Sequence, residues 1–180
     1  MTHRPTVEQL AALVGGVPAD DQALGAPTVD LTSDQWLDAL TTARDAGLAY
    51  FDWLTGVDEG DEVGIVVHLY SLDQRHGLLL RTRVARDGGQ LPSATNVFPG
   101  ASWHERETIE MYGVTFDGHP DPRPLLLPDE FHGHPLRKDF VLAARAGRDW
   151  PGAVEDPSKT GSRRRLRPPG ATGPGTWSER

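Results

Sequence analysis

The sequence predicts an α+β fold, in which a mixed, mainly antiparallel sheet carries helices on one of its faces. Residues 63–72 are mostly apolar and β-branched, and residues 78–85 alternate apolar side chains with arginines, a pattern typical of paired strands with one buried face. Helical patterns flank these strands instead of alternating with each of them, which favours a two-layer α+β domain. Prolines in residues 114–140, and glycines and prolines in residues 145–180, predict an irregular loop and an extended tail.

Length and composition fit one domain over residues 1–144, followed by a tail over residues 145–180. The chain has 180 residues and no cysteine, which excludes disulfides, thiol catalysis and cysteine-ligated zinc or iron–sulfur sites. A net charge of −8 disfavours binding to nucleic acid or anionic lipid. No run of about 18 apolar residues and no secretory signal occurs, so we expect no membrane span and place the chain in the cytoplasm, free or bound to other proteins.

The N-terminal part is predicted to form two helices separated by a short strand. Thr6 can cap a helix over residues 7–14, which two glycines follow. Residues 28–31 are expected to form a brief strand. The capping-box sequence at residues 32–35 opens a second helix, whose apolar side chains recur on one stripe and which ends near Gly47.

Three strands are predicted next. Apolar and aromatic residues predict a strand over residues 48–57, and a turn over residues 59–62 leads into the strand at residues 63–72. A second turn at residues 73–77 precedes the strand at residues 78–85. Short turns of this kind join neighbouring antiparallel strands, so the sheet should consist mainly of hairpins.

A third helix is expected after the sheet. Residues 102–105 have the capping-box pattern Ser-x-x-Glu, so the helix should begin there and continue to about Tyr112, where Gly113 ends it. Arg106 and Glu110 are four residues apart and are expected to form an ion pair on the helix surface. The loop that follows is proline-rich but also holds several leucines and phenylalanines, so it must lie against its own domain or against another chain.

Histidines and carboxylates of the third helix and the loop are the candidates for chemistry. On a helix Glu105 and Glu107 point about 200° apart, so they cannot share an acid–base site. The sequence contains no His-Glu-x-x-His, Gly-x-Ser-x-Gly or phosphate-loop motif. Two hypotheses stay open: ordinary loop residues, or an independent metal-dependent hydrolase using His119, His132 and His134. The full cluster comprises His104, Glu105, Glu107, Asp117, His119, Asp121, Asp129, Glu130, His132 and His134.

Charge is distributed unevenly along the chain. Residues 145–180 have a net charge of +4, against −12 for the rest of the chain, and too few apolar residues to fold alone. This segment is either a disordered tail or an arm that becomes ordered on a partner. In the second case Trp150 and Trp177 would be anchors, and the arginines at 163–165 and 167 would meet an acidic surface.

Four short motifs follow one another between Trp103 and Phe140. They are Trp-His-Glu-Arg-Glu-Thr-Ile-Glu-Met-Tyr-Gly (to Gly113), Phe-Asp-Gly-His-Pro (to Pro120), Leu-Leu-Leu-Pro-Asp (to Asp129) and Gly-His-Pro-Leu-Arg-Lys-Asp-Phe (to Phe140). In this order they resemble the C subunit of bacterial proton-translocating NADH:quinone oxidoreductase, respiratory complex I. The resemblance covers residues 48–140 well and the tail more loosely. Sixteen of the 18 basic residues are arginine, and the tail is similar to that of actinobacterial members.

The resemblance implies a cofactor-free structural subunit of the peripheral arm, inactive in isolation. It would lie on the cytoplasmic face of the cell membrane, in a hetero-oligomer with the D-type subunit, which helps form the quinone pocket, and the B-type subunit. Flavin and iron–sulfur clusters would be held by partner subunits and would pass electrons from NADH to quinone, with menaquinone as the expected acceptor. Related chains leave an alternative, the equivalent subunit of a membrane-bound hydrogenase or of a deazaflavin-dependent dehydrogenase.

Residues carried over from the family motifs are assigned to loop shaping and partner docking. No catalytic, cofactor-binding or metal-binding role is expected of them. The alternative role is internal packing of a proline-rich cap. The set is Glu105, Arg106, Glu107, Gly113, Gly118, His119, Pro120, Gly133, Pro135, Leu136, Arg137, Lys138 and Asp139.

Overall fold

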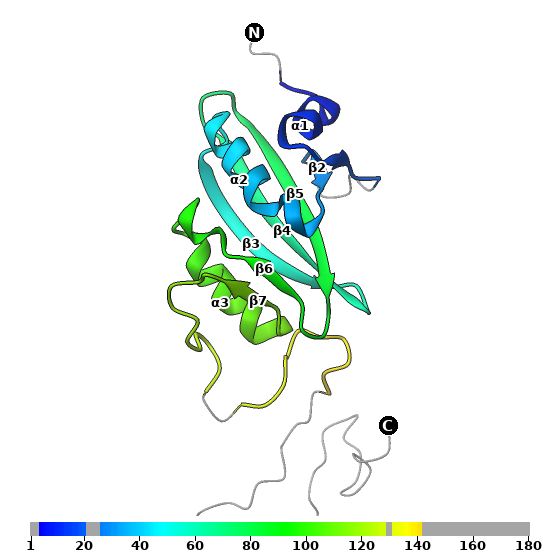
Figure 1. Cartoon of the computed structure of the whole chain (residues 1–180), viewed down its shortest axis with the longest axis vertical. Helices are drawn as coiled ribbons and strands as arrows, with labels where there is room; N and C mark the ends of the chain where they lie inside the picture. Colours follow the sequence, from blue (N-terminus) through cyan, green and yellow to red (C-terminus); the bar gives the residue numbers. More distant parts are fainter. Residues whose placement is uncertain (1–3, 21–25, 129–130, 142–180) are drawn as a thin grey trace, which may run out of the picture. The chain divides into compact units, whose positions relative to one another are not determined.

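A five-stranded sheet forms the centre of the fold (Figure 1). Its strands β3, β4 and β5 pair antiparallel in sequence order, β1 pairs antiparallel with β2, and β2 runs parallel to β5. This confirms the predicted mixed, mainly antiparallel sheet. The strands lie in the order β1 (Val17–Pro18), β2 (Thr28–Asp30), β5 (His76–Ala85), β4 (Glu62–Ser71) and β3 (Tyr50–Asp58).

The computed structural model describes residues 4–20, 26–128 and 131–141. The predicted tail and the predicted boundary after residue 144 lie outside these ranges. Within them, the four strands expected from the sequence begin and end within two residues of their predicted bounds. None of the helices in this part of the chain has the length and the apolar character that crossing a bilayer requires.

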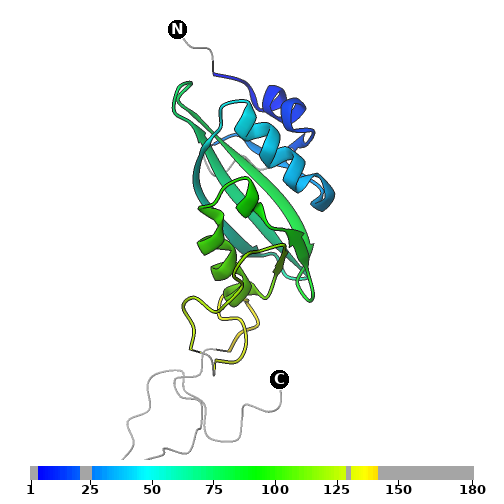
Figure 2. The same ribbon diagram turned by 60° about the vertical axis from the view of Figure 1, so that its left-hand side comes forward.

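Two helices, α1 (Val7–Val14) and α2 (Trp36–Asp45), cover one face of the sheet (Figure 2). The predicted cap at Thr6 is confirmed and is part of a full capping box, in which the amide of Thr6 donates to the side chain of Gln9 over 2.9 Å. The predicted capping box at residues 32–35 is also present, at the short 3₁₀ turn before α2, where the amide of Thr32 donates to Gln35 over 2.9 Å. The buried stripe of α2 centres on Trp36, whose side chain is fully enclosed in the core between helix and sheet. The expected two-layer arrangement is therefore confirmed.

The opposite face of the sheet carries polar and aromatic side chains. Arg81 forms a two-bond ion pair with Asp30, with distances of 2.6 and 2.9 Å, and Arg83 donates to Glu59 over 2.6 Å. Thr82, which lies between these two arginines, is fully buried. The alternation of apolar side chains and arginines in residues 78–85 thus separates a buried face of the strand from a more solvent-exposed face, as predicted.

The third helix, α3 (Ala101–Tyr112), packs against β3 and extends the helical layer towards the other end of the sheet (Figures 1 and 2). Strands β6 (Gln90–Pro92) and β7 (Thr115–Asp117) flank it in sequence and form a separate parallel pair. The aromatic ring of Tyr112 lies directly on Gly56 of β3, where a Cβ atom would come within 2.6 Å of it. Glycine at that position allows helix and strand to approach closely.

The predicted capping box at residues 102–105 is wrong. The helix begins one residue earlier, after Gly100, and Glu105 does not reach back to the helix start. Its carboxylate is instead buried against the segment that follows β6, where it accepts hydrogen bonds from the hydroxyl of Ser93 and the amide of Ala94. The predicted end of the helix is confirmed, since Gly113 follows Tyr112 in the left-handed conformation with φ of 75°.

Candidate functional site

Helix α3 and the loop after β7 bring together most of the residues assigned to docking. The helix contributes Glu105, Arg106 and Glu107, and two later segments of the loop are bound to its side chains and to its last turn. We name these segments the leucine segment (residues 123–127) and the capping segment (residues 134–138). Together with α3 they form the candidate functional site.

Glu105 holds the segment before α3 in place. Its side chain is fully buried, and its two carboxylate oxygens accept hydrogen bonds from the hydroxyl of Ser93 and from the amide of Ala94, both at 2.6 Å. The oxygen of Ser93 accepts in turn from the amide of Thr95 over 3.2 Å. Every buried polar group in this cluster has a partner, which is the condition under which a buried carboxylate is tolerated.

His119 lies beside this cluster. Its Nε2 is 3.9 Å from a carboxylate oxygen of Glu105, which is too far for a hydrogen bond. Its Nδ1 accepts from the amide of Asp121 over 3.0 Å, and its Nε2 is 3.1 Å from the carbonyl oxygen of Ser102. Because a carbonyl can only accept, we assign the proton to Nε2 of a neutral ring.

The ionisation of Glu105 is altered by its surroundings. Burial raises the pKa of Glu105, and the hydrogen bonds from Ser93 and Ala94 oppose that increase. The cluster therefore holds a fully enclosed acidic group whose pKa lies above its ordinary value.

The leucine segment is held by two side chains of α3. Arg106 donates to the carbonyl oxygens of Arg123 and Pro124 over 2.8 and 2.7 Å. The carboxylate of Glu110 accepts from three consecutive backbone amides, those of residues 125, 126 and 127, over 2.7, 2.8 and 3.2 Å. The predicted ion pair between Arg106 and Glu110 is therefore wrong, because each side chain binds the loop backbone instead.

The capping segment covers the last turn of α3. His134 donates from Nδ1 to the carbonyl oxygen of Glu110 over 2.8 Å. The amide of Leu136 donates to the carbonyl oxygen of Met111 over 3.2 Å. The guanidinium of Arg137 donates to the carbonyl oxygen of Tyr112 over 2.7 Å. The last carbonyl groups of a helix have no partners within it and carry its partial negative charge. The loop thus satisfies three of these acceptors in succession.

Arg137 has further internal partners, although the sequence assigned it to docking. Its guanidinium also donates to the carbonyl oxygen of Arg86 over 2.7 Å and to the carboxylate of Asp87 over 2.8 Å, and its side chain is only 14% exposed. For this residue the geometry favours the alternative of internal packing.

The neighbours of Arg137 are fixed through their backbone or are exposed. The amide of Lys138 donates over 2.7 Å to Asp58, at the end of β3, and this bond together with one from the amide of Gly60 lowers the pKa of Asp58. Sequence reasoning missed this role of Asp58, although an aspartate two residues before a glycine is a known signal for a side chain that accepts from the turn. Asp139 is exposed and lies 3.5 Å from the guanidinium of Arg86.

Gly113 allows the capping segment to reach the helix. Its φ of 75° suits glycine, and a Cβ atom there would come within 2.5 Å of Nε2 of His134 and 2.6 Å of the guanidinium of Arg137.

We expect Gly113→Ala to lower the free energy of unfolding by about 1–3 kcal/mol, since it adds backbone strain and displaces both side chains. Urea unfolding would measure this loss, with Gly118→Ala as the matched control: Gly118 has the same φ of 75° but open space around it. Equal losses in the two variants would contradict the proposed close contact.

The histidines do not converge on a metal site. His104 donates to the carbonyl oxygen of Leu54 over 3.0 Å, His134 is used at the end of α3, and His132 is exposed. In the ranges that the structure describes, no group of three histidine or acidic residues could hold a metal ion. Asp129 and Glu130, which belonged to the predicted cluster, lie outside those ranges. The hydrolase hypothesis therefore gains no support from the geometry.

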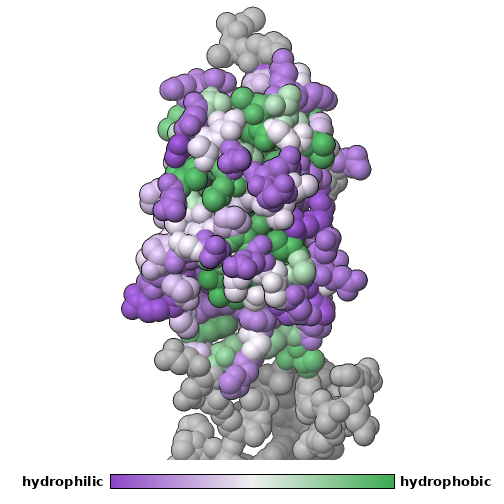
Figure 3. All heavy atoms as spheres, in the orientation of Figure 1, coloured by the Kyte–Doolittle hydropathy of each residue, from purple (hydrophilic) through white to green (hydrophobic). Residues whose placement is uncertain are grey.

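Several side chains of the site remain exposed. Trp103, on the first turn of α3, is 67% exposed, Leu126 is 60% exposed and Leu136 is 51% exposed. Figure 3 shows small apolar patches among polar groups on this side of the molecule, including its lower end, where the loop lies in Figure 1. Trp103 and Leu126 were not among the predicted site residues, because a pattern cannot show which apolar residues of a loop face outward. The remaining predicted residues with exposed positions are Glu107, Gly118, Pro120, Gly133 and Lys138.

Known proteins are similar to this chain in sequence. The family model described as respiratory-chain NADH dehydrogenase, 30 Kd subunit, matches residues 29–146. The C subunit of the NADH-quinone oxidoreductase of Caulobacter vibrioides is 41% identical over 141 residues, which cover 75% of this chain and 71% of that protein. The corresponding C subunit of Chlorobium phaeobacteroides is 41% identical over 118 residues, which cover 62% of this chain and 71% of that protein. The C/D subunit of Serratia proteamaculans is 38% identical over 133 residues, which are 67% of this chain but only 22% of that longer protein.

Solved structures share the fold. A trypsin-resistant fragment of Nqo5 aligns with a TM-score of 0.55 at 24% identity, over 64% of this chain and 95% of the fragment. A chain of the membrane-bound sulfane sulfur reductase, an archaeal respiratory membrane complex, aligns with a TM-score of 0.66 at 21% identity, over 76% of this chain and 84% of that one. The family match covers more than half of the sequence, and the chain therefore belongs to the family of the 30 Kd subunit of respiratory-chain NADH dehydrogenase, which includes the C subunits of NADH-quinone oxidoreductases.

Proposed function

We propose that this chain is the C subunit in the peripheral arm of a proton-translocating NADH:quinone oxidoreductase, and that it docks on a D-type subunit. Family membership supports the oxidoreductase, since relatives at 41% identity are subunits of that enzyme. The partner is inferred from relatives named as C/D subunits, in which a segment similar to this chain occupies about a fifth of a longer protein. A C-like and a D-like part joined in one chain must lie near each other in the assembled enzyme.

The docking surface is inferred from one observation, the outward-facing apolar side chains of a loop whose backbone is fixed. Leu126 donates its amide to Glu110 and Leu136 donates its amide to the carbonyl of Met111, so both leucines are anchored on adjacent residues of α3 while their side chains remain exposed. Apolar groups that are already held in place lose little conformational freedom on binding, and such preorganised groups make strong anchors. Exposed polar residues such as Glu107 and Lys138 would form the rim of the interface.

The other parts of the proposal extend the family assignment. We infer that this chain carries no cofactor: it has no cysteine for a cluster, and flavin and iron–sulfur clusters are assigned to partner subunits. A B-type neighbour, the cytoplasmic face of the membrane, menaquinone as acceptor and actinobacterial origin are further proposals, carried by the resemblance of residues 103–140 and by the arginine content. The isolated chain is expected to show no oxidoreductase activity.

A second candidate function is the same structural role in a related complex with another electron donor. The membrane-bound sulfane sulfur reductase contains a chain of this fold, so the fold alone is compatible with several donors. The sequence relatives, which are named as subunits of NADH-quinone oxidoreductase, favour NADH over a hydrogenase or a deazaflavin donor.

The docking surface can be tested by placing charge on it. We expect Leu126→Asp combined with Leu136→Asp to reduce recovery of the complex by at least tenfold, because an anchor in a desolvated interface contributes about 2 kcal/mol or more. The measurement is the yield of D-type subunit that co-purifies with a tagged chain from detergent-solubilised membranes. Leu13→Asp on α1, where the leucine is 43% exposed, is the matched control. Normal co-purification of the double variant, with unchanged thermal unfolding, would contradict the proposed surface.

A further inference from the structure

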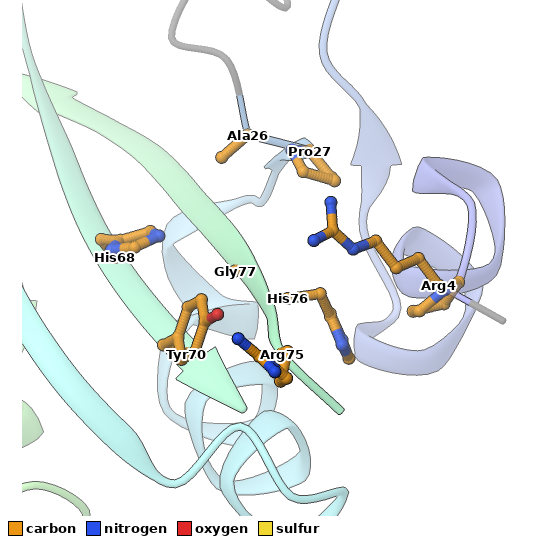
Figure 4. Close-up of a pocket in the computed structure, with 9 residues that line it drawn as sticks. Arg4, Ala26, Pro27, His68, Tyr70, Arg75, His76 and Gly77 are labelled. Carbon is orange, nitrogen blue, oxygen red and sulfur yellow. The ribbon is translucent and has the colours of Figure 1, made fainter. Parts of the chain in front are cut away.

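A pocket lies beside the turn that joins β4 to β5, and no residue of the candidate site lines it. It has a volume of about 340 Å³, and its lining includes Arg4, His68, Tyr70, Arg75 and His76 (Figure 4). Its remaining lining is small or apolar and includes Gly77, Pro5 and Pro27. The volume is at the lower end of the range for small-molecule sites, roughly 300–1,000 Å³.

The lining is positively charged although the chain as a whole is acidic. Two arginines and two histidines face the pocket, no aspartate or glutamate lines it, and the net charge of the chain is −8. In the described ranges, neither Arg4 nor Arg75 forms an ion pair with a carboxylate. In Figure 4, Arg4 comes from the segment before α1, and Arg75 and His76 come from the β4–β5 hairpin on the other side of the opening. Unpaired guanidinium groups gathered around a concave surface attract anions.

Arg75 occupies a strained backbone position. Its φ is 56°, and among the described residues it is the only one other than glycine with a positive φ. The turn holds it there, since its amide donates to the carbonyl oxygen of Ser71 over 2.8 Å. Asparagine and glycine adopt this conformation more easily than arginine, and strain of this kind concentrates at functional sites. The turn alone would favour asparagine or glycine at position 75, so the arginine side chain itself is expected to have a function.

The two histidines shape the pocket and do not supply its donors. His76 is 8% exposed, and within the described part of the chain its Nδ1 has no hydrogen bond. Burial lowers the pKa of His76, and the positive charge of Arg4 lowers it further. His68 uses its Nδ1 for Asp52 at 2.8 Å, which leaves its Nε2 over Gly77, where a Cβ atom would come within 2.5 Å of it. A residue with a Cβ atom at position 77 would therefore displace the His68 ring.

We propose that this pocket binds a phosphate group. Two guanidinium groups and the hydroxyl of Tyr70 can supply several donors to one ligand. The terminal oxygens of a phosphate can use more of these donors than the two oxygens of a carboxylate, and paired guanidinium donors match phosphate geometry. The pocket is larger than a bare phosphate ion, so a phosphate attached to a small organic group fits it. This inference does not rest on the docking proposal, because its residues are separate.

Titration of the full chain with inorganic phosphate, followed by NMR, tests the site. At constant ionic strength we expect saturable shifts of the backbone amides of residues 75–77, whereas chloride should produce none. Arg75→Asn removes the charge and keeps a residue that tolerates positive φ, so the chain should unfold at an equal or higher temperature while its affinity for phosphate falls roughly tenfold or more. Arg44→Asn, which removes an arginine of α2 outside the pocket, should leave the affinity unchanged.

A second arm of the experiment distinguishes the two sources of a phosphate group. Flotation with phosphatidylcholine vesicles that contain phosphatidic acid, but not with pure phosphatidylcholine, assigns the site to a lipid headgroup if Arg75→Asn abolishes it. Phosphate binding without flotation assigns it to a soluble phosphate compound. The proposal is overturned if phosphate produces no saturable shift, if chloride reproduces the shift, or if Arg75→Asn binds phosphate as tightly as the unchanged chain.

Discussion

Replacing Glu105 by alanine is expected to lower the free energy of unfolding by about 3–5 kcal/mol, because two buried donors lose their acceptor and a cavity remains. The hydroxyl of Ser93 and the amide of Ala94 both donate to this carboxylate over 2.6 Å, and neither position is open to water. Chemical denaturation followed by circular dichroism measures the loss. The matched control is Glu107→Ala on the exposed face of the same helix, which should change stability by no more than about 0.5 kcal/mol. Similar losses of unfolding free energy in both variants would show that the buried hydrogen bonds of Glu105 do not stabilise the fold.

Glu105→Gln separates the charge of this group from its packing. Burial raises the folded-state pKa of Glu105 above its ordinary value of 4.5, so the folded chain keeps the proton to higher pH than the unfolded chain does. The stabilisation contributed by Glu105 is therefore fully present below pH 4.5 and is lost as the pH rises from there through the raised pKa. The destabilisation caused by Glu105→Gln should accordingly shrink between acidic and neutral pH. A difference that grows with pH would mean that the folded state prefers the ionised form.

Arg137→Glu is expected to destabilise the isolated chain by about 3–5 kcal/mol, before any effect on assembly. The substitution removes donors to the carbonyl oxygens of Tyr112 and Arg86, and it places a negative charge beside Asp87 and the negative end of α3. Thermal unfolding of the purified chain measures the effect. Arg123→Glu, at an arginine whose side chain is 80% exposed, is the control and should cost far less.

Assembly experiments on Arg137 must be interpreted with this loss in mind. If Arg137→Glu leaves the isolated chain as stable as the unchanged protein but prevents co-purification of the D-type subunit, the side chain acts at the interface. If both properties are lost together, the internal role shown by its three partners accounts for the result. The second outcome is expected.

The local part of the fold was predictable from the sequence because short-range patterns determine it. The alternation of Arg81 and Arg83 with buried residues indicates a two-faced strand, and Thr6 before an apolar stripe indicates a helix start, since both signals lie within a few residues. The strand ends differ from the prediction by no more than two residues for the same reason. The parallel pairing of β2 with β5, about 50 residues away in sequence, has no local signal.

The error at Glu105 has a clear physical origin. Ser102 and Glu105 match a capping box, but the same glutamate can satisfy Ser93 and Ala94, twelve and eleven residues earlier in the chain. A tertiary contact that fills two buried donors contributes more than a cap at an exposed helix end. Sequence patterns cannot rank these two uses of one carboxylate.

The family was identified correctly, but the contacts of the residues assigned to docking were predictable only in part. Arg137 was assigned to an interface because charge beside apolar residues is typical of a rim, yet its guanidinium lies against helix carbonyls. The destination of a long side chain depends on backbone placed far away in sequence. By contrast, Leu136 is exposed as expected of a docking residue, because its neighbours fix its backbone and leave its side chain outside.

The way α3 ends also bears on when the molecule becomes able to assemble. The carbonyl of Tyr112 receives its bond from a residue 25 positions later, and that of Glu110 from one 24 positions later. During synthesis, the helix end therefore stays incomplete until the capping segment has left the ribosome, since the chain emerges in order. That segment carries Leu136, so the last turn of α3 and this part of the proposed docking surface depend on the same stretch of chain. On the proposed function, a chain that ends before the capping segment would lack this surface.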